Sequence, residues 1–215
     1  MQFTFTDEQE ELRRTMRRFL EEKSPTSEVR RLMETADGYD EAVWKQMSQE
    51  LGLAGLHIPE AYGGQGFTFV ELGIVLEEMG RALLCAPFFS TVCLAGSAIL
   101  AAGTEDAKKK LLPGIASGET IAAFALAEPS GRWDADGIDA VAEKKGDAYA
   151  ITGTKRFVID GATASLIVVA ARLKGTKGED GIGLFAVSGD ADGLTRTALE
   201  PLDPTRKQAD LELKG

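Results

Sequence analysis

The stretch GETIAAFALAEP, residues 118–129, divides the sequence into two parts of different character. Before it, apolar residues recur every three or four positions, as they do on one face of an α-helix. After it, the apolar runs are short and rich in β-branched residues, and turn pairs such as Asp160-Gly161 separate them. This pattern predicts an α+β protein in which a helical bundle is followed by a small β-barrel or β-sandwich. We place a helical domain over residues 1–120 and a β domain over residues 121–215.

Two capping boxes mark the helical part, Thr6-Asp7-Glu8-Gln9 and Thr68-Phe69-Val70-Glu71. The apolar spacing predicts helices over residues 6–20, 27–35, 40–51, 68–84, 90–102 and 104–112. We expect the third helix to bury Val43, Met47 and Leu51. We expect the last helix to stop before Pro113, because proline removes a backbone donor from the helical hydrogen-bond ladder.

The β part is expected to contain strands over residues 121–127, 140–143, 148–152, 165–172, 182–187 and 194–199. A further strand begins at Asp210, and the sequence stops one residue after Lys214. A domain that ended in mid-strand would expose an unpaired edge. We therefore expect the β domain to be incomplete and to be covered by further sequence or by a partner.

Composition excludes several functional classes. The net charge of −10, from 24 basic and 34 acidic residues, argues against nucleic acid as a partner. A single histidine, His57, and two cysteines give no support for a structural zinc site, a Ser-His-Asp triad or a Cys-His pair. No apolar run approaches the roughly 18 residues of a membrane span. The first residues lack the apolar core of a secretory signal, so we expect a cytoplasmic protein.

Six segments, taken in their order along the chain, resemble the acyl-CoA dehydrogenase family. They are FTDEQEELRRTMRRFL (5–20), IPEAYGGQG (58–66), LPGIASGE (112–119), ALAEPSGRWD (125–134), GTKRFVIDGA (153–162) and LDPTR (202–206). The resemblance covers essentially the whole sequence. It implies a helical N-terminal domain and a β middle domain, whereas the family's C-terminal four-helix domain has no counterpart here.

The resemblance also implies a reaction. Family members oxidise an acyl-CoA to the 2,3-enoyl-CoA with FAD, while a glutamate removes the α-proton of the substrate. That glutamate belongs to the C-terminal domain, so we name no catalytic residue in this chain. Glu128 precedes a proline at a strand end and is interpreted as architectural. A homo- or hetero-tetramer, and an electron-transfer flavoprotein as electron acceptor, are implied as partners.

The flavin contacts of the family fall within this chain. The matching positions are Phe124, Leu126, Ala127, Trp133, Phe157, Val158 and Ile159. Ala127, Trp133 and Ile159 stand where the family carries hydroxyl side chains. The position of Trp133 also faces the CoA, so this indole is a candidate substrate contact that would either block the pantetheine entrance or stack on a ligand.

Three missing hydroxyls leave three interpretations open. The chain belongs to an FAD-dependent acyl-CoA dehydrogenase in which backbone groups hold the flavin. Alternatively, it is a non-catalytic subunit of a heteromeric acyl-CoA dehydrogenase with a degenerate flavin site. A flavin-dependent monooxygenase relative on the same fold is a further alternative.

Overall fold

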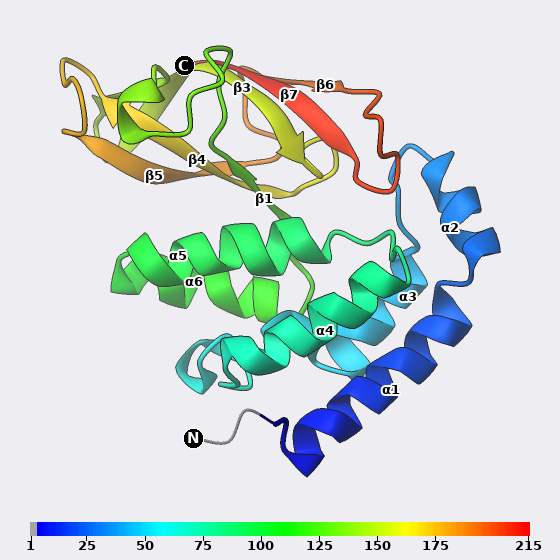
Figure 1. Ribbon diagram of the computed structural model, residues 1–215. Coiled ribbons are helices and arrows are strands. Elements are labelled where there is room, and N and C mark those ends of the chain that lie inside the picture. Colours follow the sequence, from blue (N-terminus) through cyan, green and yellow to red (C-terminus); the bar gives the residue numbers. More distant parts are fainter. Residues whose placement is uncertain (1–3) are drawn as a thin grey trace.

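Helices occupy the first half of the chain and strands the second half in the computed structural model, which describes residues 4–215 (Figure 1). The α-helices are α1 (Asp7–Lys23), α2 (Thr26–Met33), α3 (Glu41–Lys45), α4 (Phe69–Arg81), α5 (Ser97–Ala102) and α6 (Glu105–Ala116). Gln46–Glu50 and Phe89–Gly96 are π-helical, and Leu53–Gly55, Glu60–Tyr62 and Ala135–Gly137 are 3₁₀ turns. The strands are β1 (Ala122–Ala125), β2 (Val141–Lys145), β3 (Ala148–Ile159), β4 (Leu166–Leu173), β5 (Ile182–Ser188), β6 (Leu194–Ala198) and β7 (Gln208–Lys214). This order confirms the expected α+β organisation, and the exact domain boundary at residue 120 stays a prediction.

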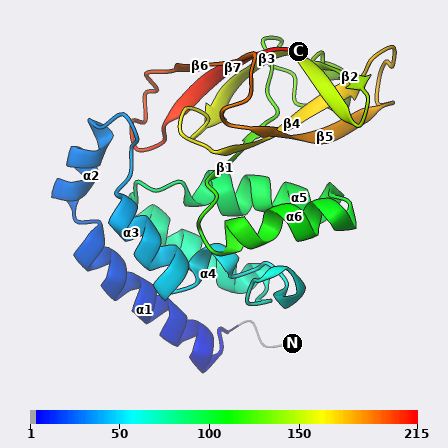
Figure 2. The same ribbon diagram turned by 180° about the vertical axis from the view of Figure 1, so that it is seen from behind.

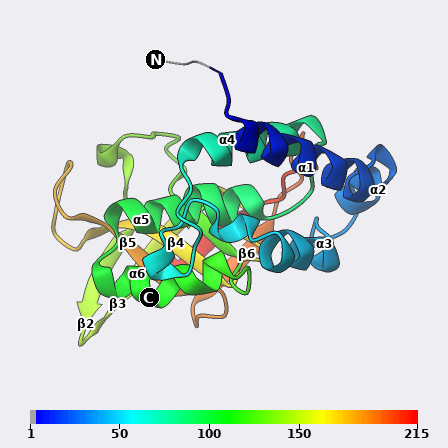
Figure 3. The ribbon, with the colours of Figure 1, turned by 90° about the horizontal axis from the view of Figure 1, so that it is seen from below.

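The molecule is layered. A curled sheet lies over α5 and α6, and α4 and α1 lie farther from the sheet (Figure 2). Seen from the helical side, α1 and α4 run side by side (Figure 3). Across residues 4–215, none of the helices is both long and apolar enough to cross a lipid bilayer.

A buried carboxylate links α1 to α4. Glu78 is 1% exposed and accepts hydrogen bonds from the guanidinium groups of Arg17, at 2.6 Å, and Arg81, at 2.9 Å. These bonds hold the pKa of Glu78 at about 2 despite burial. The predicted capping boxes at Thr6 and Thr68 are both present, and they start α1 and α4.

Two expectations about the helices are wrong. Leu51 is 37% exposed instead of buried, because its N–H bonds to the carbonyl of Gln46, five residues back, in a wide π turn that shifts the helical register. Helix α6 continues through Pro113 to Ala116. The fully buried Leu112 and Ile115 anchor this last turn, so packing outweighs the loss of one backbone donor.

The sheet has the order β1-β4-β2-β3-β7-β6, with β5 on the other side of β4. β1 and β2 pair with β4 in parallel, and the remaining pairs are antiparallel. One face of β4 packs on the helices through Leu166 and Val168, and the other lies in the concave interior of the sheet through Ile167 and Val169.

Two expectations about the strands are also wrong. β3 was expected over residues 148–152 but continues to Ile159, because its second half pairs with the distant β7 and carries a bulge between Lys155 and Val158. β7 was expected to offer an unpaired edge. It lies between β3 and β6 and is hydrogen-bonded on both sides.

Side chains join the helical part to the strand part. The Ser90 hydroxyl donates to the Asp160 carboxylate at 2.6 Å. The Arg206 guanidinium donates to the carbonyl of Leu84 at 2.7 Å, and the Lys207 ammonium donates to the carbonyl of Met33 at 2.6 Å. The loop that precedes β7 is therefore fastened to the ends of α2 and α4.

Candidate functional site

The segment after β1 and the bulge of β3 form one continuous surface. The N–H of Arg156 donates to the carbonyl of Ala127 at 2.8 Å, and the Lys155 ammonium donates to the carbonyl of Leu126 at 3.1 Å. The structure thus brings together the two segments, 124–133 and 157–159, that hold the predicted flavin residues.

A buried ion pair fixes this junction. Lys155 is fully buried and its ammonium lies 2.5 Å from the carboxylate of Glu128, which also accepts the backbone N–H groups of Asp139 and Ala140. Burial lowers the pKa of Lys155, and Glu128 opposes that shift. Glu128 is therefore occupied by structural contacts. Sequence reasoning missed Lys155, because it lies beyond the strand predicted over residues 148–152 and carries no local signal of its burial.

Phe157 projects from the bulge. Its backbone has a φ of +54°, a left-handed conformation that costs a non-glycine residue about 1–2 kcal/mol, and its ring is 58% exposed. Asp210 on β7 holds this geometry, since its carboxylate accepts the N–H of Phe157 at 3.3 Å and pairs with the guanidinium of Arg156 at 2.8 Å. The guanidinium also lies 5.2 Å from the centre of the Phe157 ring.

The other predicted residues differ in their surroundings. Phe124 packs with the cluster that faces α5 and α6, and Val158 is 2% exposed and faces the concave interior of the sheet. Leu126, Ala127 and Ile159 are partly buried. Trp133 is 79% exposed on the loop between β1 and β2. The structure therefore buries Val158, leaves Trp133 and Phe157 exposed, and leaves the other four residues partly buried.

These residues fit a flat heteroaromatic group such as a flavin. Within residues 4–215, the N–H groups of Leu126 and Ala127 donate to no other group, so two backbone donors remain available beside the exposed Phe157 ring. A backbone N–H without a protein partner is open to a ligand or to water. Ala127 and Ile159 carry no side-chain donor and Trp133 carries only its indole N–H, so backbone groups supply most of the donors at these positions.

An apolar cavity of about 300 Å³ opens between the end of α4 and the following segment. It is lined by Leu76, Met79, Gly80, Leu84, Ala86, Phe88, Phe89 and Arg206. Phe89 precedes Ser90, whose hydroxyl binds Asp160 directly after Ile159. The cavity therefore adjoins the predicted flavin segment of β3.

Asp160 is a perturbed carboxylate at this place. Burial raises its pKa to about 6, although the hydrogen bond from Ser90 and the charge of Arg206 act in the opposite direction. Its backbone has a φ of +54° and its N–H donates to the carbonyl of Lys207 at 2.9 Å.

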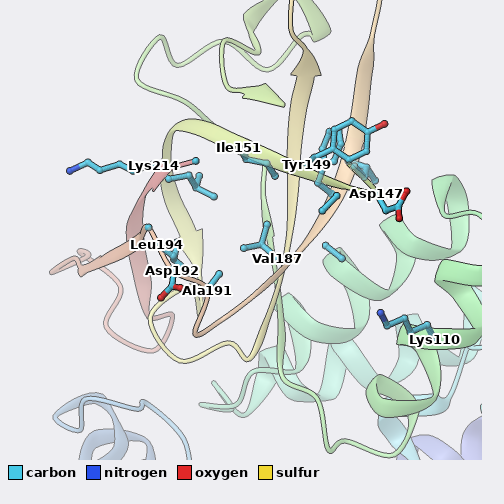
Figure 4. Close-up of a pocket in the computed structure, with 16 residues that line it drawn as sticks. Lys110, Asp147, Tyr149, Ile151, Val187, Ala191, Asp192, Leu194 and Lys214 are labelled. Carbon is cyan, nitrogen blue, oxygen red and sulfur yellow. The ribbon is translucent and has the colours of Figure 1, made fainter. Parts of the chain in front are cut away.

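A larger cavity of about 510 Å³ lies elsewhere, on the concave side of the sheet (Figure 4). Ile151, Val187 and Leu194 point into it, with Lys110 and Asp147 at its rim. None of the predicted flavin residues lines this cavity, so size alone does not locate the candidate site.

The described residues give little support for a metal site or for a reactive thiol. In the part of the chain from residue 4 onward, no group of three or more His, Cys, Asp or Glu side chains could hold a metal ion. Burial raises the pKa of Cys93 to about 12 and lowers the pKa of His57. The thiol of Cys93 therefore stays protonated at neutral pH and is a poor nucleophile.

Comparison with known proteins gives two matches to family models. The N-terminal domain of acyl-CoA dehydrogenases matches residues 6–119, and the middle domain of acyl-CoA dehydrogenases matches residues 123–214. An acyl-CoA dehydrogenase of Bacillus subtilis is 32% identical over 193 residues, which are 88% of this chain and 50% of that protein. The chain thus spans about half the length of this relative.

Solved structures share the fold. The glutaryl-coenzyme A dehydrogenase glutaryl-CoA complex superposes with a TM-score of 0.88 at 28% identity, over 100% of this chain and 55% of that chain. The ChsE4-ChsE5 complex of Mycobacterium tuberculosis superposes with a TM-score of 0.86 at 26% identity, over 100% of this chain and 56% of that chain. The two domain matches and the shared fold establish that this chain belongs to the acyl-CoA dehydrogenase family, a family of flavoprotein oxidoreductases of lipid metabolism.

Proposed function

We propose that the chain provides the flavin-binding and acyl-binding parts of an FAD-dependent acyl-CoA dehydrogenase, which converts an acyl-CoA to the 2,3-enoyl-CoA. The observation that carries this proposal is the pair of unpartnered backbone donors at Leu126 and Ala127 beside the exposed Phe157 ring. The hydrogen bond between Arg156 and Ala127 fixes the two segments relative to each other, so donors and ring are preorganised.

The residues of this chain would bind and orient. When bound, FAD would accept the hydride that leaves the β-carbon of the substrate. The N–H groups of Leu126 and Ala127 would donate to acceptor atoms at the flavin edge, and the ring of Phe157 would stack on the flavin plane. The side chain of Ile159 offers no hydrogen-bond donor, and Trp133 would contact the CoA portion of the substrate at the entrance.

The apolar cavity beside β3 would take the acyl chain. Leu76, Met79 and Phe89 supply apolar surface there, and each buried methylene of a ligand contributes about 0.8 kcal/mol. Filling the cavity would exclude water from the reacting carbons. We assign no catalytic base within residues 1–215, since Glu128 is bound by Lys155 and two backbone donors. The base would be a glutamate supplied from outside this sequence.

The partners follow from the same proposal. A tetramer of identical or different chains would complete the active site, and an electron-transfer flavoprotein would accept the electrons. A cytoplasmic location fits this role.

A second candidate is a non-catalytic subunit of a heteromeric acyl-CoA dehydrogenase. The replacement of three hydroxyl positions by Ala127, Trp133 and Ile159 favours it, as does the similarity to the ChsE4-ChsE5 complex. Such a subunit would buttress the active site of its partner and retain little flavin.

Flavin binding separates the candidates. The purified chain is titrated with FAD, alone and co-expressed with the product of its neighbouring gene, and bound flavin is quantified after gel filtration. Addition of an acyl-CoA then tests for a shift of the flavin absorbance, which reports a thioester bound beside the flavin and does not require the catalytic base. Stoichiometric FAD in this chain with an acyl-CoA-dependent shift supports the dehydrogenase. Flavin confined to the partner chain supports the second candidate, and flavin in neither chain contradicts both.

A further inference from the structure

A single positive charge lines the apolar cavity. Seven of the lining residues are apolar or glycine, and the eighth is Arg206, from the loop before β7. Three of the apolar lining residues, Met79, Leu84 and Phe88, are almost fully buried, at 4%, 4% and 2% exposure. A guanidinium in such surroundings is costly to desolvate unless its donors are satisfied.

Only part of this guanidinium is satisfied by the chain. Nη1 donates to the carbonyls of Leu84, at 2.7 Å, and Thr205, at 3.0 Å. Within residues 4–215, Nε and Nη2 of Arg206 donate to no protein group, and neither is enclosed as a buried unsatisfied atom. Arg206 therefore has donors left over that remain accessible.

The neighbouring carboxylates are engaged elsewhere. Asp160 accepts the hydroxyl of Ser90 at 2.6 Å, and Asp203 accepts the hydroxyl of Thr205 at 2.6 Å. Arg206 influences both carboxylates through space, but neither comes within ion-pair distance of it in the described part of the chain. The positive charge of Arg206 thus has no direct counter-ion.

Lys207 provides a comparison within the same loop. Its ammonium also binds a carbonyl of the helical part, that of Met33 at 2.6 Å, but Lys207 does not line the cavity. The hydrogen bonds that fasten the loop to the helical part explain the position of the Lys207 ammonium and of Nη1 of Arg206. They do not account for the free donors of Arg206 at an apolar cavity.

We propose that Arg206 recognises a carboxylate at the far end of the acyl chain, so that the cavity selects ω-carboxyl acyl-CoA thioesters over methyl-ended ones. The inference rests on the proposed acyl-binding role of the cavity and adds the class of substrate to it. The free Nε and Nη2 form the side of a guanidinium that binds a carboxylate with two parallel hydrogen bonds.

The test compares two CoA thioesters of equal chain length, glutaryl-CoA and valeryl-CoA, by isothermal titration calorimetry on the 215-residue chain. Adipoyl-CoA and hexanoyl-CoA form a second, longer pair. The variants are Arg206→Gln, which removes the charge, and the matched Lys207→Gln, which removes one charge and one carbonyl contact from the same loop. Using the ratio of dissociation constants within a pair cancels effects on CoA binding and on net charge.

We expect the unmodified chain and Lys207→Gln to bind the ω-carboxyl ester more tightly, by on the order of tenfold, and Arg206→Gln to lose that preference. Equal binding of both esters by the unmodified chain would overturn this inference and leave the proposed function intact. An equal loss of preference in both variants would also overturn it. Failure of every ester to bind would refute the acyl-binding role and this inference with it. Should Arg206→Gln fail to fold, the ratio for the unmodified chain decides the question.

Discussion

The ammonium of Lys155 lies 2.5 Å from the carboxylate of Glu128, and both side chains are withdrawn from solvent at the point where β3 meets the end of β1. Breaking a buried ion pair leaves an uncompensated charge, which is far more costly than losing a surface pair. The surface proposed for FAD therefore depends on a contact that lies beneath it.

Replacing Glu128 by glutamine is expected to lower the free energy of unfolding by about 3–5 kcal/mol, because Lys155 stays buried without a counter-ion. Urea unfolding followed by circular dichroism measures this change. The exposed pair Lys45–Glu41, at 58% and 73% side-chain exposure, gives the control, and Lys45→Met should cost no more than about 0.5 kcal/mol. A loss of similar size in the two variants would contradict the role of burial.

The pH dependence of stability should carry a signature of Asp160. Its pKa in the folded protein, about 6, lies above the usual 3.8, so folding favours the protonated form. Stability gained by protonation is present at low pH and is lost as the pH rises from about 4 to about 6. Asp160→Asn should therefore stabilise the protein at pH 7–8, by about 1–2 kcal/mol since some solvent reaches the residue, and this gain should disappear near pH 4.

Thermal unfolding of Asp160→Asn across this pH range tests the prediction, with the exposed Asp192→Asn as control. A stabilisation that does not vary with pH would show that the carboxylate of Asp160 is not the cause.

Phe157 allows its ring and its backbone to be tested separately. Phe157→Gly removes the ring but suits the φ of +54°, so we expect stability within about 1 kcal/mol of the original chain. FAD affinity should fall about threefold to tenfold because the stacking surface is lost. Phe157→Tyr keeps the ring and should keep the affinity, as measured by quenching of flavin fluorescence. Unchanged affinity in Phe157→Gly would remove this residue from the flavin site.

Restoring the family's hydroxyls should increase flavin retention. The triple variant Ala127→Thr, Trp133→Ser, Ile159→Thr adds up to three hydrogen-bond donors, each contributing about 1 kcal/mol. The fraction of FAD that remains after gel filtration is the measurement. Ala198→Thr, at the exposed last residue of β6, controls for a general effect of added threonine. Equal retention in the triple variant and the original chain would mean that backbone groups alone set the affinity.

The sequence predicted local structure better than long-range structure. The capping boxes at Thr6 and Thr68 start helices as expected, because a cap needs only residues within one turn. The exposure of Leu51 could not be predicted from apolar spacing, because a π turn shifts the helical register there. The continuation of α6 through Pro113 could not be predicted either, because it depends on packing against distant residues. The second half of β3 was missed for a related reason. Its partner β7 lies about 50 residues later, and its bulge interrupts the alternation that marks a strand.

The candidate site shows the same division. Matching segments located the residues around Ala127 and Phe157, and the structure places these two segments side by side. Asp210, which holds Phe157 in place, carries no local signal of that role, because its partner is set by the register of β3 on β7. The role of Lys155 depends on its burial, and the role proposed for Arg206 depends on the cavity that it lines. Neither feature can be recognised from the sequence alone.

The contact between Phe157 and Asp210 also constrains the order in which the protein folds as it is synthesised. Because 53 residues separate Phe157 from Asp210, the ribosome synthesises all of β3 well before it synthesises Asp210, the residue that holds the bulge of β3. Until β7 emerges, the second half of β3 has no neighbour on that side, and the surface proposed for FAD does not exist. Loading of the proposed FAD is thus expected to be a late event, and a chain terminated before residue 208 would lack the surface proposed for FAD while retaining the helices described between residues 4 and 207.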